Sequence, residues 1–238
     1  NLSEILKFSR ALKTAQKIAL FLDFDGTLVP IQKDPARCFL LDKTKKQLHF
    51  LSDTNHFYVS ILSGRSLPDI KKKVGINKIY YGGNHGLDIS GPCMKYTNPV
   101  ALKARPVICS VKRKLKTVTK RFEGVWLEDK NYSLSFHYRS VRTKDTPEVK
   151  KVFYDTTGEF FKKNLLTLIK GKKVLELAPY VSWNKGKAVF WIMKKLKDKC
   201  LPIYIGDDQT DETAFKALFQ KGITIRVGKS KTTFAFWL

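Results

Sequence analysis

The stretch IALFLDFDGTLVP, residues 18–30, joins an apolar run to two acidic residues and a glycine. A continuous apolar run of this length is typical of a strand that is buried on both faces of a sheet. Asp23 and Asp25 end the run, and Gly26 follows directly. Burying a carboxylate without a partner is costly, and two carboxylates close together repel each other. The stretch therefore predicts a buried strand whose carboxyl end carries charge that other groups must compensate.

Strand-like and helix-like segments alternate at both ends of the chain. In order, the expected segments are KIALFLDF, a helix around 42–53, FYVSILS, a helix near 66–74, KIYYGG, and later a helix over 185–198, PIYIGDD, a helix over 210–220 and GITIRV. This alternation indicates an α/β fold with a Rossmann-like parallel sheet that helices cover on both faces.

The middle of the chain follows another pattern. Residues 103–122 are expected to form one helix, and YSLSFHYR alternates apolar and polar residues as a half-exposed antiparallel strand does. A helix around 147–163 and the runs LLTLI and KVLELAPY complete an α+β segment. The sequence therefore predicts a core made of residues 1–100 and 178–238, interrupted by an inserted domain at 101–177.

Composition limits the class of protein. No apolar stretch approaches the roughly 20 residues that a membrane helix needs, and the first residues lack the features of a signal peptide. Four scattered cysteines without metal-ligand spacing favour reduced thiols and a cytoplasmic location. The chain does not begin with Met, so it is expected to belong to a longer protein.

The formal net charge of +24 raises a non-enzymatic alternative, a basic nucleic-acid-binding module. Solvated helix faces explain the same charge, because the basic residues are spread along the chain. No arginine-rich or aromatic-interleaved stretch supports nucleic-acid binding. The sequence is therefore expected to bind a small molecule, and neither nucleic acid nor a membrane.

Three expected strands end in polar clusters: DFDGT, SGR and GDDQTDE. In parallel sheets such ends meet at one edge, where ligands bind. Five carboxylates would gather there, those of Asp23, Asp25, Asp207, Asp208 and Asp211. Oxygen ligands without a His or Cys cluster point to Mg²⁺, with Ser63 and Lys185 available for a phosphate group. Each motif alone has an ordinary explanation as a turn, a loop or a helix start. The prediction of a metal and phosphate site therefore depends on the motifs occurring together.

The motifs LDFDGTL, ILSGR, WNKG and GDDQTDE resemble the four signatures of the haloacid dehalogenase (HAD) superfamily of phosphotransferases. The resemblance implies that Asp23 is the nucleophile and Asp25 the acid and base. It also implies that Ser63 and Lys185 hold the phosphoryl group, with Gly64 and Arg65 contacting the substrate. Mg²⁺ would be held by Asp23, Asp25 and Asp207, with Asp208 and Asp211 as weaker candidates. The insert lies where this superfamily places its larger, C2-type cap domain.

Three further blocks, YGGNHGLDISGP, WLEDKNYSLSFHYR and KKVLELAPYVSWNKGKA, resemble the trehalose-6-phosphate phosphatase family. The resemblance implies hydrolysis of trehalose 6-phosphate through an aspartyl-phosphate, and sugar binding by Glu128, Lys130, Arg139 and Glu176. Without it, these four residues read as ordinary cross-strand charge pairs on a solvent-facing surface. Two departures stand out. Ala178 occupies a position where the family often has Arg, and the chain stops at TFAFWL, where relatives continue into a final helix.

Other interpretations remain open. A phosphatase for another sugar phosphate, such as sucrose 6-phosphate, would share the motifs. A catalytically idle domain attached to a synthase is a further alternative, against which the intact motif residues argue. GITIRVGKS does not fit a nucleotide-binding P-loop, because five residues separate Gly222 from Gly228 where four are required.

Overall fold

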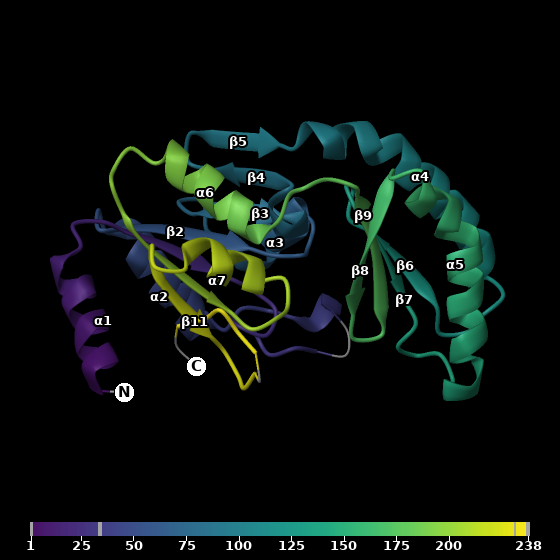
Figure 1. Cartoon of the computed structure of the whole chain (residues 1–238), viewed down its shortest axis with the longest axis horizontal. Coiled ribbons are helices and arrows are strands. Elements are labelled where there is room, and N and C mark those ends of the chain that lie inside the picture. The colour runs from purple at the N-terminus through teal and green to yellow at the C-terminus, as the bar shows by residue number, and fades with distance from the viewer. Residues whose placement is uncertain (1, 33–34, 231, 237–238) are drawn as a thin grey trace. The chain divides into compact units, whose positions relative to one another are not determined.

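The computed structural model describes residues 2–32, 35–230 and 232–236. These residues form two compact units (Figure 1). The first consists of Asn1–Tyr96 together with Trp183–Leu238, and the second of Thr97–Ser182. The last two residues of the C-terminal TFAFWL lie outside the described residues.

The first unit is built around one mixed sheet. Within the described residues the sheet has seven strands, in the order β11-β10-β1-β2-β3-β4-β5. The strands are β1 (Ile18–Leu22), β2 (Phe57–Leu62), β3 (Tyr80–Gly83), β4 (Asp88–Gly91), β5 (Met94–Thr97), β10 (Leu201–Gly206) and β11 (Ile223–Arg226). The helices are α1 (Leu2–Thr14), α2 (Asp42–Asp53), α3 (Leu67–Val74), α6 (Lys185–Lys195) and α7 (Glu212–Leu218), with short 3₁₀ turns at Pro35–Arg37 and Asn84–Gly86.

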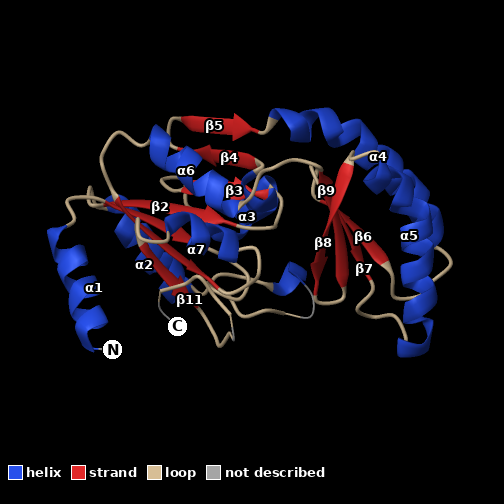
Figure 2. Ribbon diagram, in the orientation of Figure 1, coloured by secondary structure: helices blue, strands red, loops and turns tan. Residues whose placement is uncertain are grey.

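Alternating side chains of β1 explain why helices cover both faces of this sheet. Ala19 and Phe21 pack with residues of α6 and α7, whereas Ile18 and Leu22 pack toward the helices of the other face. Figure 2 shows these strands between the two helical layers. Because successive strand residues point to opposite faces, the continuous apolar run fills two cores at once. The predicted α/β fold with a parallel sheet is confirmed.

One edge of the sheet departs from the parallel pattern. Strands β11, β10, β1, β2 and β3 pair in parallel, but β4 runs antiparallel to β3, and β5 lies beyond it. This antiparallel pair was not predicted from the sequence. A two-residue turn joins β4 to β5, and its Cys93 adopts a positive φ of 54°. The segments DISG and MKYT contain few apolar residues, so they do not show the pattern of a buried strand.

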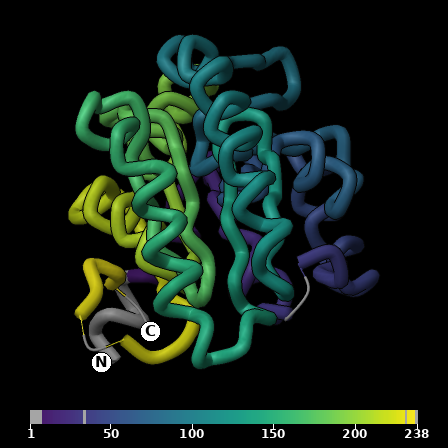
Figure 3. The backbone as a smooth tube through the Cα atoms, turned by 90° about the vertical axis from the view of Figure 1, so that its right-hand side faces the viewer, coloured from purple at the N-terminus to yellow at the C-terminus, as the bar shows by residue number. Residues whose placement is uncertain are grey.

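The second unit is a four-stranded antiparallel sheet with two helices. Its strands are β6 (Trp126–Asp129), β7 (Leu134–His137), β8 (Leu166–Gly171) and β9 (Val174–Pro179), in the order β6-β7-β9-β8. Its helices are α4 (Pro99–Thr119) and α5 (Thr146–Lys162), with a 3₁₀ turn at Thr143–Asp145. The two helices run side by side (Figure 3) and bury the face that carries Leu134 and Phe136.

Helix α4 begins four residues earlier than the predicted 103 and ends at Thr119 rather than 122. Asn98 caps it by accepting a hydrogen bond from Val100 N–H at 2.9 Å, and Pro99 takes the first helical position, where no N–H is needed. In the part of the chain that the structure describes, no helix combines the length and the apolar character needed to cross a membrane.

Candidate active site

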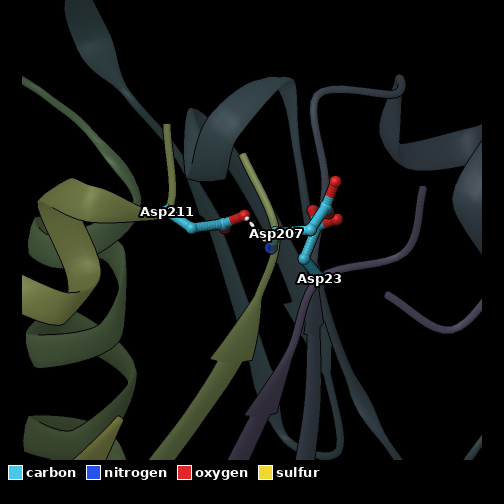
Figure 4. A group of neighbouring side chains, drawn as sticks. All are labelled: Asp23, Asp207 and Asp211. Carbon is cyan, nitrogen blue, oxygen red and sulfur yellow. Dashed lines mark hydrogen bonds between the residues drawn. The ribbon is translucent and has the colours of Figure 1, made fainter. Parts of the chain in front are cut away.

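Three neighbouring strands of the first unit end in polar residues. Asp23 follows β1, Ser63 follows β2 and Asp207 follows β10, and β1 pairs in parallel with both other strands. Parallel strands end at the same edge of a sheet, so the structure brings the three residues together. Figure 4 shows Asp23 and Asp207 at the ends of adjacent strands, with Asp211 beside them.

Lys185 lies at the start of α6, which Asn184 caps by accepting a hydrogen bond from Lys187 N–H at 3.0 Å. Its Nζ donates to Oδ1 of Asp23 and to Oδ1 of Asp211, each at 2.7 Å, and its side chain is only 2% exposed. Burial opposes the charged form, but the neighbouring carboxylates outweigh it and hold the pKa of Lys185 well above its ordinary value. Lys185 is therefore a fixed positive charge next to Asp23.

Asp211 is buried, and both of its carboxylate oxygens accept hydrogen bonds from several groups. The sequence had indicated it only as a weaker candidate for a metal ligand. Its Oδ1 accepts from Lys185 and, at 2.6 Å, from the Tyr204 hydroxyl. Its Oδ2 accepts the N–H groups of Asp207 and Asp208, both at 3.0 Å. Asp211 thus ties the loop after β10 to Lys185. The role of Tyr204 was missed, because a tyrosine within an apolar strand looks like ordinary core.

The carboxylate of Asp208, a predicted metal ligand, is directed into its own loop. Its Oδ1 accepts from Thr210 N–H at 2.8 Å, from the Thr210 hydroxyl at 2.7 Å and from Asp211 N–H at 3.1 Å. Burial works against ionisation, but Lys185 and these hydrogen bonds lower the pKa of Asp208 to about 2. Asp208 is therefore an ionised residue that holds the loop in place.

Asp25 forms a two-pronged ion pair with Arg65. Arg65 Nε and Nη2 donate to the two carboxylate oxygens of Asp25, each at 2.6 Å. Arg65 also donates to Asp69 at 2.9 Å and to the Pro35 carbonyl at 3.0 Å. The paired geometry fixes the direction of the Asp25 carboxylate more firmly than a single contact would. Arg65 was predicted to contact the substrate, but in this structure its guanidinium group binds Asp25.

Gly26 follows Asp25 directly, and no other residue fits its position. Its φ is +97°, and an added Cβ would lie 2.1 Å from Oδ2 of Asp207. The Thr27 hydroxyl donates to Oδ1 of the same carboxylate at 3.1 Å. The turn at Gly26 therefore leaves room for the Asp207 side chain.

Ser63 and Gly64 form the turn after β2. Ser63 is buried, and its Oγ accepts from Arg65 N–H at 3.2 Å. Gly64 packs against the ring of His85, where an added Cβ would lie 2.8 Å from Cε1. In the motif SGR, Ser63 therefore supplies a hydroxyl group, Gly64 allows close packing of the backbone, and Arg65 pairs with Asp25.

The acidic cluster fits a divalent cation. Asp23, Asp207 and Asp211 each offer a carboxylate oxygen, and these atoms lie within 4.8 Å of one another. Burial, followed by the charge of Asp208, raises the pKa of Asp207 in spite of the hydrogen bond from Thr27, so a bound cation would stabilise the ionised carboxylate. Carboxylate oxygens without nitrogen or sulfur donors suit a hard cation.

A second polar cluster lies on the sheet of the second unit, on the face opposite α4 and α5. Glu176 of β9 accepts from Lys130 Nζ at 2.8 Å, from Ser133 Oγ at 2.7 Å and from Ser135 Oγ at 3.2 Å. The expectation that this face of YSLSFHYR is half-exposed was wrong for the serines. Ser133 and Ser135 are 1% and 0% exposed, and both donate to the buried Glu176.

Glu128 lies on the same face, as the cross-strand partner of Ser135, whose partner on the other side is Glu176. Its Oε2 lies 2.9 Å from Nε2 of His137. Burial works against ionisation, but His137 and Lys130 lower the pKa of Glu128. Arg139 donates to the Lys172 carbonyl at 3.1 Å, at the end of the polar row. No role was predicted for His137 from the sequence.

Comparisons with known proteins agree on one family. The chain is 36% identical over 220 residues to trehalose-phosphate phosphatase B of Arabidopsis thaliana, covering 87% of this chain and 58% of that protein. It is 35% identical over 248 residues to trehalose 6-phosphate phosphatase RA3 of Zea mays, covering 96% and 67%. The chain thus spans about three-fifths to two-thirds of the length of these relatives.

A solved structure supports the fold. The C-terminal domain of Candida albicans trehalose-6-phosphate phosphatase superimposes with a TM-score of 0.81 at 24% identity, covering 96% of this chain and 90% of that one. A sequence model of the trehalose-phosphatase family matches residues 21–235. The chain therefore belongs to the trehalose-phosphatase family.

Proposed function

We propose that this chain hydrolyses trehalose 6-phosphate to trehalose and inorganic phosphate. The observation that carries the proposal is the buried Asp23 at the end of β1, bound to Lys185 and adjacent to a cluster of carboxylate oxygens. An acid in this setting is oriented and has its charge partly offset, as a nucleophile toward phosphorus requires. Membership of the trehalose-phosphatase family supports the choice of substrate.

In the proposed reaction, an Asp23 oxygen forms a bond to phosphorus while the bond from phosphorus to the sugar oxygen breaks. Asp25 gives a proton to the departing oxygen, which leaves as the trehalose hydroxyl. Asp25 then takes a proton from water as the water oxygen attacks phosphorus, and Asp23 is released as a carboxylate. Arg65 holds both oxygens of the Asp25 carboxylate, so Asp25 must release at least one of these contacts before it can carry the proton. The Ser63 hydroxyl and Lys185 bind the phosphoryl oxygens.

We infer that Mg²⁺ is held by Asp23 and Asp207, with the backbone carbonyl of Asp25 as a further ligand. Both Asp211 oxygens already accept hydrogen bonds from Lys185, Tyr204 and two backbone N–H groups. Asp211 therefore shapes the site, and Asp208 is a weaker candidate since Thr210 occupies its Oδ1. When bound, the ion supplies positive charge that offsets the negative charge on the transferring phosphoryl group.

We further propose that the second unit is the cap domain, with the expected boundaries 101–177 lying inside it. The cluster of Glu128, Lys130 and Glu176, with Arg139 near it, would recognise the sugar hydroxyls. A carboxylate accepts hydrogen bonds and an ammonium or guanidinium group donates them, so this set suits a ligand whose hydroxyls do both.

The function is tested by phosphate release from a panel containing trehalose 6-phosphate, sucrose 6-phosphate and glucose 6-phosphate. We expect hydrolysis of the trehalose ester to be preferred, to stop when EDTA removes divalent cations and to return with added Mg²⁺. Equal efficiency on every ester, or a preference for the sucrose ester, would overturn the proposed substrate. Full activity in EDTA would overturn the metal assignment.

Glu176→Gln keeps the size of the side chain but removes the charge that pairs with Lys130. We expect KM for trehalose 6-phosphate to rise roughly tenfold, the effect of about 1.4 kcal/mol of lost binding, while hydrolysis of glycerol 2-phosphate is unchanged. The matched control is Glu159→Gln, which removes an exposed glutamate of the same unit that also pairs with a lysine. Equal losses on both esters would contradict a sugar-binding role for Glu176.

A further inference from the structure

An aromatic stack lies on the polar sheet face of the second unit. Trp126 of β6 and His137 of β7 are cross-strand partners in the antiparallel register. Their ring centroids are 3.7 Å apart and their planes are within 5° of parallel. Such a stack holds both rings upright on the sheet, because each ring restricts the rotation of the other.

The stack is joined to Glu128 by a hydrogen bond. Because a lowered pKa keeps the Glu128 carboxylate ionised, it only accepts hydrogen bonds, so Nε2–H of His137 is the donor across 2.9 Å. Trp126 and Glu128 are two residues apart on one strand and therefore point to the same face. Trp126, His137 and Glu128 form one element, which we call the Trp–His–Glu row.

Trp126 differs from the rest of the polar cluster in being exposed. Its strand, β6, is an edge strand of the sheet, and 42% of the residue is accessible to solvent, whereas Lys130 and Glu176 are buried. One side of the indole faces His137 and β7, so the accessible surface lies toward the open edge. An indole beside an ionised carboxylate presents an apolar plane next to a hydrogen-bond acceptor.

A pyranose ring has the matching chemistry. Its axial C–H groups form an apolar face, and its equatorial hydroxyls project from the rim. Aromatic side chains combined with a few placed polar groups are typical of small-molecule sites. We propose that the Trp–His–Glu row determines specificity for one glucose ring of the disaccharide: Trp126 packs on the apolar ring face, and His137 positions Glu128 to accept a sugar hydroxyl. The inference rests on the proposed function and deepens it.

Trp126→Ala tests the apolar contact. We expect KM for trehalose 6-phosphate to rise roughly three- to tenfold with kcat nearly unchanged, while glycerol 2-phosphate, which has no ring, is hydrolysed as before. Trp126→Phe keeps a planar apolar side chain and should recover most of the loss. The matched control is Tyr154→Ala, which removes another exposed aromatic residue of this unit, from helix α5. It should leave both substrates unaffected.

His137 is tested by two variants that separate its two contacts. His137→Phe keeps a flat ring for Trp126 but has no donor for Glu128, whereas His137→Gln keeps an N–H donor but has no ring. We expect both to raise KM for trehalose 6-phosphate and to leave glycerol 2-phosphate unchanged. Adding Glu128→Gln to His137→Phe should cost little more, since the two residues act as one element.

Binding of trehalose, measured by calorimetry on the intact protein, gives a readout independent of turnover. Weaker binding in Trp126→Ala, with unchanged melting temperature, supports the inference. Unchanged trehalose binding and KM in Trp126→Ala, or equal losses on both esters, would overturn it. If the unaltered protein hydrolyses glycerol 2-phosphate but not trehalose 6-phosphate, the proposed function fails; if it turns over both and the variants show no selective loss, only this inference fails.

Discussion

Asp23→Asn is expected to lower phosphate release from trehalose 6-phosphate by roughly a thousandfold or more, as loss of a catalytic nucleophile does in other enzymes. The substitution exchanges one carboxylate oxygen for an NH₂ group and keeps the shape of the side chain. A neutral amide is a poor nucleophile and cannot form the aspartyl-phosphate. Lys185 retains its contact with Asp211 at 2.7 Å, so the lysine stays paired and the fold of the first unit should persist.

Two measurements make this result specific. Circular dichroism and thermal melting should show that Asp23→Asn is folded, so that the loss is chemical. Asp53→Asn is the matched control, because Asp53 also pairs with a lysine, at 2.7 Å, but lies exposed on α2. It should keep native activity. Turnover by Asp23→Asn near the native rate would contradict the assignment of Asp23 as the nucleophile. The acidic cluster would then have a role in metal binding alone.

Much of the core was predictable because its pattern is local. The run before Asp23 is continuously apolar, so it had to be a strand with two buried faces, and its polar end had to lie at the edge where ligands bind. The predicted helices around 42–53 and 66–74 are present as α2 and α3. By contrast, β4 and β5 are set by pairing at the sheet edge, and their residues, DISG and MKYT, contain too few apolar side chains to indicate it.

The contacts within the site were less predictable, since they depend on which way side chains turn. Asp25 and Arg65 are 40 positions apart in the chain, and nothing in DFDGT or SGR indicates that they form a two-pronged ion pair. Asp211 accepts hydrogen bonds from Tyr204 and Lys185, which lie on a strand and a helix, respectively. The same limit applies to Ser133 and Ser135: the alternation placed them on the polar face, but it could not indicate that both are buried and donate to a glutamate from another strand.

Lys185→Met is expected to impair both stability and activity. Methionine is similar in length, so the cavity stays filled, but the buried Asp23 and Asp211 lose their shared cation. Removing one partner of a buried ion pair costs about 3–5 kcal/mol, because the remaining charges are left without compensation. We expect a loss of that size in the free energy of unfolding of the first unit, measured by urea denaturation, together with little or no phosphate release.

The effect should depend on pH, and its sign follows from the site. Burial raises the pKa of Asp23, and Lys185 is the cation that opposes this rise. Without Lys185, the folded state should hold a proton on Asp23 that the unfolded state has released. A state that binds more protons gains stability as pH falls, so Lys185→Met should be more destabilised at pH 8 than at pH 5.

Lys194→Met, an exposed lysine of the same helix, separates this effect from a general loss of positive charge. Since the chain carries a formal net charge of +24, removing a surface lysine reduces repulsion and should leave stability nearly unchanged or slightly higher. Equal destabilisation by both variants would show that Lys185 acts through helix α6 alone. A loss of stability that occurs only in Lys185→Met and is greater at high pH would show that the charge of Lys185 stabilises the buried carboxylate of Asp23. Asp23 is the proposed nucleophile.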